Sequence, residues 1–476
     1  MGASRRQLIY QFISESILIV MLTLVLAVTI VQLLLSSFNE LSAKTLQLHL
    51  LDSPILLVLL LAGLISGLLS GTYPAFYLSR IKPSLILKQH RSKPKRQSLR
   101  QLLVVGQFAM AIVMITATIV IYEQMNFIQN ADLGYQRDQR ITVDINSQPM
   151  REKYESVKAA FQKIPSVQQV TATNRVPGEW KEIPIAGVDK DGSTLDFLYL
   201  AGDENFLPTY GIQLLAGRNF RHSTADSAKV ILNETSVQAM GLSDPIGQTI
   251  DVTHFFQEKL EVPFVAEVVG VIQDVHFESV REKIAPTIIT YYQNPLHRID
   301  YYTLQINPKN ISQTLAEIEA VTQQFDPDSP LEYHFLDDQF KELYLSDTKT
   351  AEIIGIAALL AIFIACMGLF GLTHLSVIER TKEVGIRKAL GASIAHIIWL
   401  IAQNFLKLVG IAFIIASPFA WWATRTWLNE FAYHIDMSVA LLLTSGTVVV
   451  IVAVITISFQ TIKAALANPT DSLRYE

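Results

Sequence analysis

The sequence predicts an α-helical multi-pass membrane protein with a mixed α/β extracytoplasmic domain inserted between two long stalk helices. Half of the 476 residues are hydrophobic and only 17% are charged, which is too apolar for an ordinary soluble enzyme. The apolar residues gather in six runs, and a helix needs only about 20 residues to cross a hydrocarbon core roughly 30 Å thick. A longer, more polar stretch separates the third run from the fourth.

The six runs are the expected membrane helices, and the lipid bilayer is therefore the first expected partner. They lie near 12–35, 55–78, 102–122, 353–377, 394–423 and 438–462. The first run is too long for the apolar core of a signal peptide, and no clear cleavage site follows it. The single cysteine, Cys366, lies inside the fourth run, which excludes a disulfide framework. A net charge of −5 spread along the chain argues against a nucleic-acid partner.

The distribution of lysine and arginine predicts the orientation in the membrane. Residues 80–100 are rich in both and contain no acidic residue, so the positive-inside rule places them in the cytoplasm. When six helices are threaded through the membrane, both termini and the segment 379–391 lie on the same side. The large insert 123–352 then faces outward.

Two short sequence matches indicate an internal repeat. Residues 2–4 (GAS) match residues 391–393, and each match precedes an apolar helix. The stretch 82–88 (KPSLILK) corresponds to 468–474 (NPTDSLR), and each closes a second helix. The shared order and spacing favour a duplicated unit over coincidence.

The insert has the alternating pattern of a folded α/β domain. Asn233 is a plausible N-cap for a short helix that Gly241 stops. The β-rich runs are 140–145, 167–173, 228–233, 265–272 and 301–306, with helical patterns at 154–163 and 311–324.

The helices that flank the insert look longer than the membrane requires. The helical pattern that begins at Leu102 persists to about Asp132, which corresponds to roughly 45 Å at 1.5 Å per residue. We therefore expect a two-helix stalk between the membrane and the outer domain. The alternative is two separate short helices with a break at the membrane surface.

The segment 379–391, ERTKEVGIRKALG, places charges between two apolar runs. Glu383 and Arg387 are four residues apart in the order that stabilises a helix. Lys382 and Lys388 are expected to face water with them. Gly385 and Gly391 allow a close approach or a sharp exit. Such a segment is either a solvated helix face or a surface on which a cytoplasmic partner acts.

Other motifs indicate packing rather than chemistry. Gly63, Gly67 and Gly71 are spaced four residues apart on one helix face and predict close helix packing. The sequence contains no phosphate-binding loop, HExxH, GxSxG or paired-cysteine motif, so we expect no catalytic activity and no cofactor in this chain. Asp274, His276 and Glu278 alternate along an extended run, which is more typical of surface chemistry than of a metal site.

The segment ERTKEVGIRKALGAS, two following membrane helices and the ending PTDSLR resemble the MacB/FtsX-like permeases of ABC transporters. The stretches 206–220, 230–250 and 270–289 resemble the MacB-type periplasmic core domain of that family. The resemblance covers 101–476 closely, and 1–90 look like the last part of a preceding permease domain.

The resemblance implies a domain organisation. The expected divisions are 1–90, a partial FtsX-like permease domain with two membrane helices; 91–100, a basic cytoplasmic linker; 101–133, a membrane and stalk helix; 134–336, a MacB-like periplasmic core domain; and 337–476, an FtsX-like permease domain. The last division includes a coupling helix at 379–391 and two membrane helices.

The resemblance also implies a function and a place in the cell. A separate cytoplasmic ABC ATPase would hydrolyse ATP, and the permease would pass its movement to the periplasmic domain, a process called mechanotransmission. The residues that would face the ATPase are Glu379, Lys382, Glu383, Arg387 and Lys388. The expected location is the bacterial inner membrane, with both termini cytoplasmic. A periplasmic adaptor and a second permease are further candidate partners.

Two functions agree with this resemblance. The first is export or efflux of a substrate whose identity the sequence does not indicate. The alternative is a non-transporting, FtsX-like membrane protein that takes part in signalling or regulates a cell-wall hydrolase. An adaptor encoded nearby would favour the first function, and a two-component kinase or a peptidoglycan hydrolase would favour the second.

The repeat leads to an expectation about the start of the chain. In the second copy, a long helix, an outer domain and another long helix precede the charged segment. The first copy begins at the position that matches Leu390. We therefore expect the chain to be the C-terminal part of a longer permease of two fused repeats, with Met1 an internal methionine. The alternative is a short form that borrows the missing helices from another subunit.

Overall fold

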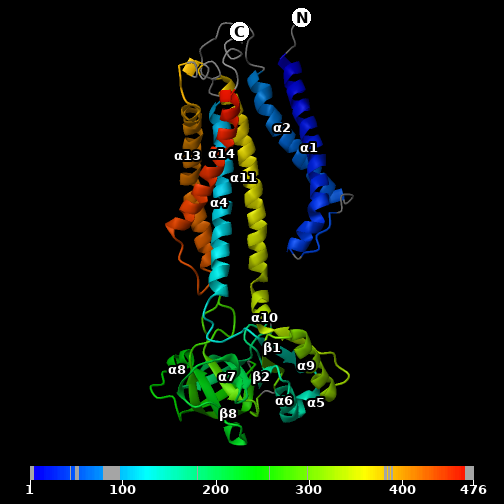
Figure 1. Ribbon diagram of the computed structural model, residues 1–476, viewed down its shortest axis with the longest axis vertical. Coiled ribbons are helices and arrows are strands. Elements are labelled where there is room, and N and C mark those ends of the chain that lie inside the picture. The colour runs from blue at the N-terminus through cyan, green and yellow to red at the C-terminus, as the bar shows by residue number, and fades with distance from the viewer. Residues whose placement is uncertain are drawn as a thin grey trace. The chain divides into compact units, whose positions relative to one another are not determined.

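The computed structural model divides the chain into two compact units (Figure 1). The first comprises 1–119, 349–421 and 438–476, and the second comprises 120–348 and 422–437. The structure describes residues 5–42, 44–48, 53–78, 97–179, 181–256, 258–296, 299–379, 383, 386–387 and 390–466. The domain divisions expected from the sequence follow repeats and resemblance rather than compactness, and they stay predictions.

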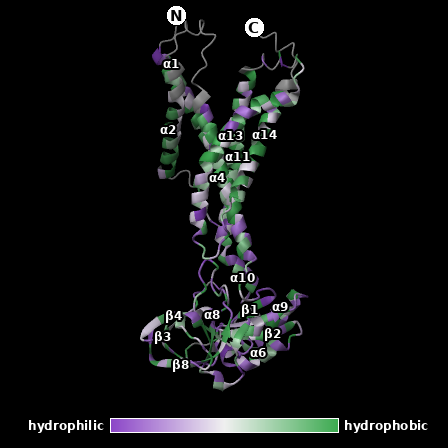
Figure 2. Cartoon of the chain, turned by 90° about the vertical axis from the view of Figure 1, so that its left-hand side faces the viewer, coloured by the Kyte–Doolittle hydropathy of each residue, from purple (hydrophilic) through white to green (hydrophobic). Residues whose placement is uncertain are grey.

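The first unit contains most of the long apolar helices. They are α1 (Arg5–Ser42), α2 (Ser53–Leu78), α4 (Gln97–Gln129), α11 (Leu345–Glu379), α13 (Ile394–Leu428) and α14 (Val439–Leu466). All six are long and apolar enough to cross a membrane, which confirms the predicted multi-pass fold class. Many of their apolar side chains are exposed, and Figure 2 shows hydrophobic residues along the helices of this unit. Lipid would cover such side chains.

Four of these helices share one apolar core. Phe108 and Ile112 of α4, Leu369 of α11, Ile401 of α13 and Ala453 of α14 are all buried in it. The buried contributions of α13 include several small residues, which allow neighbouring helices to approach closely.

Among the described residues, the second unit contains one mixed sheet of eleven strands. Its four strands in the order β11-β1-β10-β2 all pair antiparallel, and together with their helices they form the part that we call the first lobe. Its elements are β1 (Arg140–Asp144), α5 (Gln148–Glu152), α6 (Tyr154–Gln162), β2 (Val167–Thr173), β10 (Tyr301–Ile306), α9 (Ile311–Phe325) and β11 (Tyr333–Phe335). This is the split β-α-β arrangement of ferredoxin-like folds. Tyr302, Phe161 and Ile318 lie in the core between its sheet and helices.

The second lobe is inserted between β2 and β10. Its elements are β3 (Ile185–Lys190), β4 (Ser193–Gly202), α7 (Phe206–Tyr210), β5 (Leu214–Gly217), η1 (Thr224–Asp226), β6 (Lys229–Asn233), α8 (Glu234–Met240), β7 (Thr249–Phe255), β8 (Glu258–Ile272) and β9 (Thr287–Tyr291). The two lobes join through one residue pair of the sheet, Thr173 opposite Gly202. A Cβ atom at Gly202 would lie 2.9 Å from the Phe206 side chain, so this junction needs glycine.

The β-rich runs and helical patterns of the sequence correspond to β1, β2, β6, β8, β10, α6 and α9. The predicted cap is also confirmed, because the Asn233 side chain accepts a hydrogen bond from Ser236 N and Gly241 ends α8 at φ 69°. The strands β3, β4, β5, β7, β9 and β11 lie outside the predicted runs. Most of their sequences mix polar residues with apolar ones, and each strand is held by its neighbours in the sheet.

One difference concerns the return to the membrane. The stalk helix expected on this side is not continuous from residue 337, because α10 (Leu336–Leu343) and α11 are separated at Tyr344. The Tyr344 hydroxyl accepts a hydrogen bond from Val280 N at 2.8 Å and lies 3.1 Å from Ser279 Oγ. These tertiary contacts hold Tyr344 out of regular helical geometry.

Candidate functional sites

The charged segment between α11 and α13 forms a short helical turn in its described part. Leu390 N donates to Ile386 O at 3.0 Å, and Ala392 N donates to Arg387 O at 3.0 Å. Gly391 has φ 89°, a left-handed conformation that ends the turn and favours glycine. Ser393 then starts α13, because its hydroxyl accepts a hydrogen bond from His396 N at 3.3 Å.

The ion pair expected from the sequence is present in this turn. Arg387 Nη2 lies 2.9 Å from Glu383 Oε1, and both side chains are partly exposed. Ile386 and Leu390 are apolar and exposed beside them, Leu390 to 81%. The segment therefore offers charged and apolar groups together, as expected for a surface at the boundary between water and lipid.

The other predicted residues of the segment are placed as follows. Glu379 is the last residue of α11. Lys382, Gly385 and Lys388 lie outside the described residues.

The three spaced glycines of α2 face α1. A Cβ atom at Gly67 would lie 2.9 Å from Ile17 Cα, and one at Gly71 would lie 3.0 Å from the Ser16 side chain. At Gly63 the nearest atom would be a Leu24 methyl at 3.2 Å. The α1 backbone thus runs directly against the glycine face.

Polar side chains are few in the core of the four-helix bundle. Thr116 Oγ1 of α4 donates to Ser445 Oγ of α14 at 2.8 Å, and both residues are buried. Such a hydrogen bond stabilises the contact between two helices where no water competes for the hydroxyl groups.

The two lobes of the second unit form the outer domain, and a buried polar network lies where these lobes meet. Asp203, which follows β4, is fully buried, and Lys158 Nζ of α6 lies 2.8 Å from its carboxylate. Thr171 Oγ1 donates to Asp203 at 2.6 Å, Ala172 N donates at 3.1 Å, and the Tyr154 hydroxyl also donates to it. Asp203 belongs to the second lobe and these four donors to the first, so the network fastens the lobes together.

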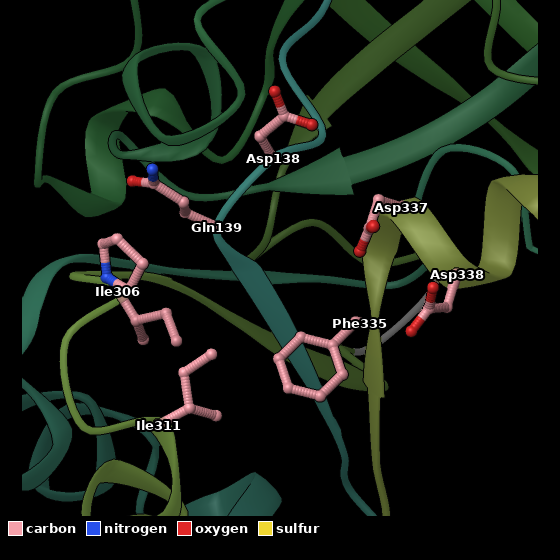
Figure 3. A pocket seen from close by; sticks show the side chains of 8 residues that line it. Asp138, Gln139, Ile306, Ile311, Phe335, Asp337 and Asp338 are labelled. Carbon is pink, nitrogen blue, oxygen red and sulfur yellow. The ribbon is translucent and has the colours of Figure 1, made fainter. Parts of the chain in front are cut away.

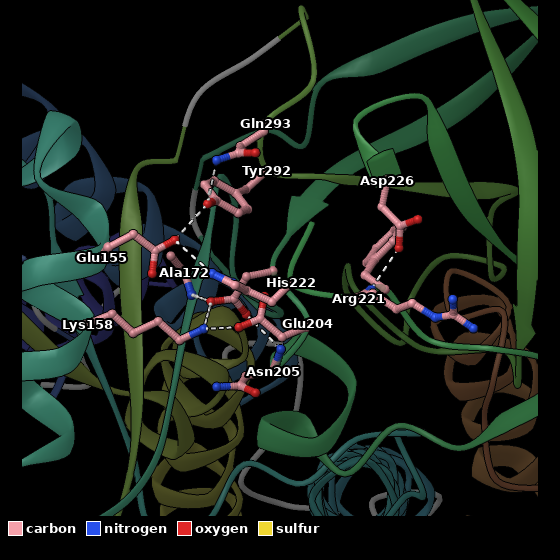
Figure 4. A network of polar contacts seen from close by, with 12 residues as sticks. Glu155, Lys158, Ala172, Glu204, Asn205, Arg221, His222, Asp226, Tyr292 and Gln293 are labelled. Atoms are coloured by element: carbon pink, nitrogen blue, oxygen red, sulfur yellow. Dashed lines mark hydrogen bonds and ion pairs between the residues drawn. The ribbon is translucent and has the colours of Figure 1, made fainter. Parts of the chain in front are cut away.

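The network continues to the surface through Glu204 (Figure 4). Lys158 Nζ lies 2.6 Å from Glu204 Oε1, and His222 Nδ1 lies 3.6 Å from Glu204 Oε2. The other ring nitrogen of His222 lies 3.8 Å from Glu155 Oε1.

Electrostatics in the network favour its charged form. Burial lowers the pKa of Lys158, but the carboxylates of Asp203 and Glu204 outweigh burial and raise that pKa above its usual value. Burial raises the pKa of Glu204, but the hydrogen bond from Lys158, a backbone hydrogen bond and the charges of Lys158 and His222 together outweigh burial, so this pKa is lowered. The two carboxylates therefore hold the buried Lys158 side chain in its charged form.

A second cluster holds the loop 422–437, between α13 and α14, against the rest of the second unit. Ala432 N donates to Arg281 O at 2.7 Å, and the Arg281 guanidinium lies 4.6 Å from the centre of the Phe431 ring. The same guanidinium pairs with Asp347 of α11. Arg281 therefore links this loop to α11.

Gln124 and His276 complete the attachment of this loop. Gln124 of α4 accepts a hydrogen bond from Ile435 N at 2.9 Å and donates to Tyr433 O at 3.1 Å. The His276 and Tyr433 rings meet edge to face at 4.8 Å. Burial lowers the pKa of His276, which favours the neutral ring in this contact.

The three alternating residues Asp274, His276 and Glu278 make separate contacts. Asp274 accepts hydrogen bonds from Thr235 N at 3.0 Å and Thr235 Oγ1 at 2.8 Å, and so holds the start of α8. His276 packs on Tyr433, and burial with the charge of Glu282 raises the pKa of Glu278. Among the described residues, no group of three or more His, Cys, Asp or Glu side chains is arranged to hold a metal ion.

Sequence reasoning missed Asp203, Lys158, Arg281 and Asp347. The partners in each pair are more than 40 residues apart, so no local spacing indicates them. The one local signal is the Asp-Glu dipeptide at 203–204, which directly follows β4, a strand that the sequence analysis did not predict.

The fold and these clusters describe a membrane protein whose long helices run from a membrane unit into an outer α/β domain, with a charged segment between two of them. A model of the FtsX-like permease C-terminal region matches residues 1–83 and 355–469, and a model of the MacB-like periplasmic core domain matches 104–321. This chain belongs to the MacB/FtsX-like permease family.

Three solved structures illustrate what this chain is similar to. The periplasmic region of MacB from Actinobacillus actinomycetemcomitans is 15% identical, with coverage of 44% of this chain and 94% of that one and a TM-score of 0.32. The extracellular domain of the noncanonic ABC-type transporter YknZ from Gram-positive bacteria is 13% identical (41% and 98% coverage, TM-score 0.29). A domain of a putative permease from Porphyromonas gingivalis is 16% identical (42% and 90% coverage, TM-score 0.29). No curated protein matches the chain.

Proposed function

We propose that this chain is the permease subunit of an ABC-type transporter and that it moves its outer domain in response to a separate cytoplasmic ATPase. Its purpose in this proposal is export or efflux of a substrate. The observation that carries the proposal is the match to both family models. The charged segment 379–391 lies within 355–469, the second range that the FtsX-like permease model matches. In this family the permease is a membrane component and the ATPase is a separate activity.

The proposed ATPase contact is the segment 379–391. Glu379, Lys382, Glu383, Arg387 and Lys388 would form the charged contact surface. The ion pair between Glu383 and Arg387 stabilises the turn and leaves both side chains partly exposed. Both side chains are therefore still accessible for contact with the ATPase. Gly391 has the left-handed geometry that ends the described turn, and we include Gly385 in the proposed contact as a second residue that allows a close approach.

Movement at this segment would reach the outer domain through continuous helices. The segment is joined directly to α11 and α13, and α11 is 35 residues long. At 1.5 Å per residue that is roughly 50 Å, well beyond a hydrocarbon core of about 30 Å. The helix α4, of 33 residues, provides the second long connection.

Exchanging the two charges of the ion pair tests the coupling proposal. Glu383→Arg combined with Arg387→Glu keeps an ion pair four residues apart but alters the surface offered to a partner. We expect co-purification of the ATPase in mild detergent to fall about tenfold or more, as for loss of a charged contact worth 1.4 kcal/mol. The matched control exchanges Lys229 and Glu267, an ion pair on the outer domain.

Full co-purification of the exchanged variant would contradict the coupling role. The identity of the other co-eluting proteins separates the two kinds of function. A periplasmic adaptor or a second permease would support transport. A two-component kinase or a cell-wall hydrolase would instead support a non-transporting role.

We further propose a location in the bacterial inner membrane with both termini in the cytoplasm. The support is the basic stretch 80–100 and the positive-inside rule. In a Cys366→Ala background, a cysteine at Glu261 on the outer domain should react with an impermeant thiol reagent in intact cells. A cysteine at Lys95 should react only after the membrane is opened. Equal labelling at Lys95 before and after opening would exclude this topology.

A further inference from the structure

We propose that the free edge of β11 and the pocket beside it form a docking site for an extended, basic peptide segment of a partner protein. The site lies in the first lobe of the outer domain. It is independent of the ATPase contact proposed for 379–391, so either proposal can fail alone.

The edge itself offers unpaired backbone groups. β11 is the terminal strand of the sheet in the described part of the chain, and it pairs only with β1. Asp144 N donates to Glu332 O at 3.1 Å, so this opposed pair is hydrogen-bonded. Bonded pairs alternate in an antiparallel ladder, so the next bonded pair is Thr142 with His334. The backbone groups of Tyr333 and Phe335 therefore point to the free edge.

These groups suit a short added strand. Tyr333 presents a donor and an acceptor, and Phe335 presents a donor. The Phe335 carbonyl is directed to α10, for which Phe335 is the N-cap. A peptide that lies antiparallel or parallel to β11 can bond to these groups, as in other complexes where a peptide adds a strand to a sheet edge.

A pocket of about 300 Å³, within the size range of ligand sites, lies at the Phe335 end of β11 (Figure 3). Its lining residues are Asp138, Gln139, Ile306, Pro308, Ile311, Phe335, Asp337 and Asp338. They come from the start of β1, the end of β10, the start of α9, and the junction of β11 with α10. Figure 3 shows the apolar side chains of Ile306, Ile311 and Phe335 gathered at one part of the pocket and the aspartates at another.

The apolar part of the pocket is open to an incoming side chain. Ile311 is 39% exposed, and Phe335 is only partly buried. Tyr333 is exposed on the same face of the strand as Phe335, and their rings meet at 5.9 Å. Because side chains of an added strand alternate in direction, every second residue of the peptide would face these groups. One aliphatic side chain next to Phe335 would enter the pocket.

Charge selects a basic peptide over an acidic one. None of the eight lining residues is basic, and three are aspartates. Lys341 of α10 pairs with Asp337 at 3.0 Å and Asp338 at 2.9 Å, but its own side chain is 60% exposed. A lysine or arginine from a partner can share or replace that contact.

Short charged edge strands also protect proteins from unwanted sheet pairing. That role alone does not require an apolar pocket beside the edge. The combination of free backbone groups, an apolar recess and an acidic rim matches an alternating basic and aliphatic strand.

The experiment uses the full chain in lipid nanodiscs and fluorescence anisotropy of a labelled peptide, Lys-Thr-Lys-Leu-Lys-Thr-Lys. We expect saturable binding that weakens with added salt. The acidic counterpart, with Glu in place of Lys, should not bind. A peptide methylated on its backbone nitrogens should lose binding, because it cannot pair with the edge. Nanodiscs without protein give the contribution of lipid.

Variants locate the binding. Asp337→Asn combined with Asp338→Asn should weaken binding about tenfold, and Phe335→Ala should weaken it for lack of the apolar contact. Tyr333→Pro removes one edge donor on the solvent side of the strand, where proline is tolerated. The matched control is Glu258→Gln with Glu261→Gln, two exposed carboxylates on β8.

The proposal is overturned by absence of saturable binding, by equal binding of the acidic or methylated peptide, or by an equal loss in the β8 control. The paired aspartate variant keeps the test decisive if Tyr333→Pro unfolds the lobe, because it alters exposed side chains and leaves the strand intact.

Discussion

The four-helix bundle and the outer domain bury different things. The bundle core is mostly apolar, the polar side chains buried in it are neutral ones such as Thr116, Thr373 and Ser445, and many of its outward side chains are apolar as well. The outer domain buries apolar side chains in two cores but also encloses charged ones at the boundary between its lobes. In lipid, apolar burial favours no particular helix arrangement, so close approach has to hold the helices together. In water, apolar burial drives folding, and the buried charges fix how two lobes fit.

Their polar contacts differ in the same way. Asp203 accepts from five donors, because Asn205 N at 3.0 Å joins the four of the first lobe. Thr116 and Ser445 share a single interhelical bond. Removing one member of a dense network strongly destabilises the fold, because each remaining partner is left buried without a hydrogen bond. Removing a single bond between two neutral hydroxyls destabilises the bundle much less.

The largest effect is therefore expected from Asp203→Ala. The change leaves the Lys158 ammonium buried with one fewer carboxylate and should destabilise the outer domain by about 3–5 kcal/mol. Hydrogen exchange of β2 and β4 amides in the full chain measures the opening free energy. The control is Glu267→Gln, which removes the partly exposed partner of Lys229 and should cost less than about 1 kcal/mol. Equal losses would remove the distinction between buried and exposed charges.

A smaller effect is expected from Gly67→Leu in α2. The added side chain meets the α1 backbone at Ile17, and overpacking of this kind costs about 1–3 kcal/mol. Thermal unfolding in detergent should occur at a lower temperature. Gly371→Leu in α11 is the control, because no atom outside its own helix and chain neighbours lies within 4 Å of a Cβ there. If both variants melt alike, close approach at Gly67 does not stabilise the pair.

Acid should weaken the outer domain through Glu204. Its folded-state pKa is lowered by Lys158, so its stabilisation is present above the unfolded value near 4.3 and is lost as pH falls through the folded value. The effect is smaller than that of removing Asp203, because Glu204 is partly exposed. Comparing wild type with Glu204→Gln by hydrogen exchange should show a stability difference at pH 7 that shrinks below about pH 4. A difference that grows on acidification would reverse the assigned sign.

The smallest effect concerns Thr116 and Ser445. Thr116→Val and Ser445→Ala, singly and together, form a double-mutant cycle for the interhelical bond. Its coupling energy should be about 0.6 kcal/mol, the average for such bonds between membrane helices. A coupling as large as the Asp203 effect would mean that polar contacts organise the bundle as strongly as the outer domain.

Several parts of the fold could be predicted because their signals are local. Six apolar runs indicate membrane helices by length alone, and Asn233 and Gly241 mark the ends of α8 within nine residues of chain. The turn at Glu383 and Arg387 follows from a spacing of four residues. The break at Tyr344 could not be predicted in this way, since it depends on Val280, which is distant in the chain.

The candidate sites divide along the same line. The sequence by itself determined the membrane helices, the charged segment at 379–391 and the glycine face of α2. Each follows from hydropathy or from the spacing of charged residues or glycines, which are properties of residues close together in the chain. Only the tertiary structure decided that Lys158 meets Asp203, that Arg281 joins Phe431 to Asp347, and that the edge of β11 borders an apolar pocket. Each of these depends on which strands and loops become neighbours. That choice is made by burial and backbone pairing over the whole domain, and no short stretch of sequence contains it.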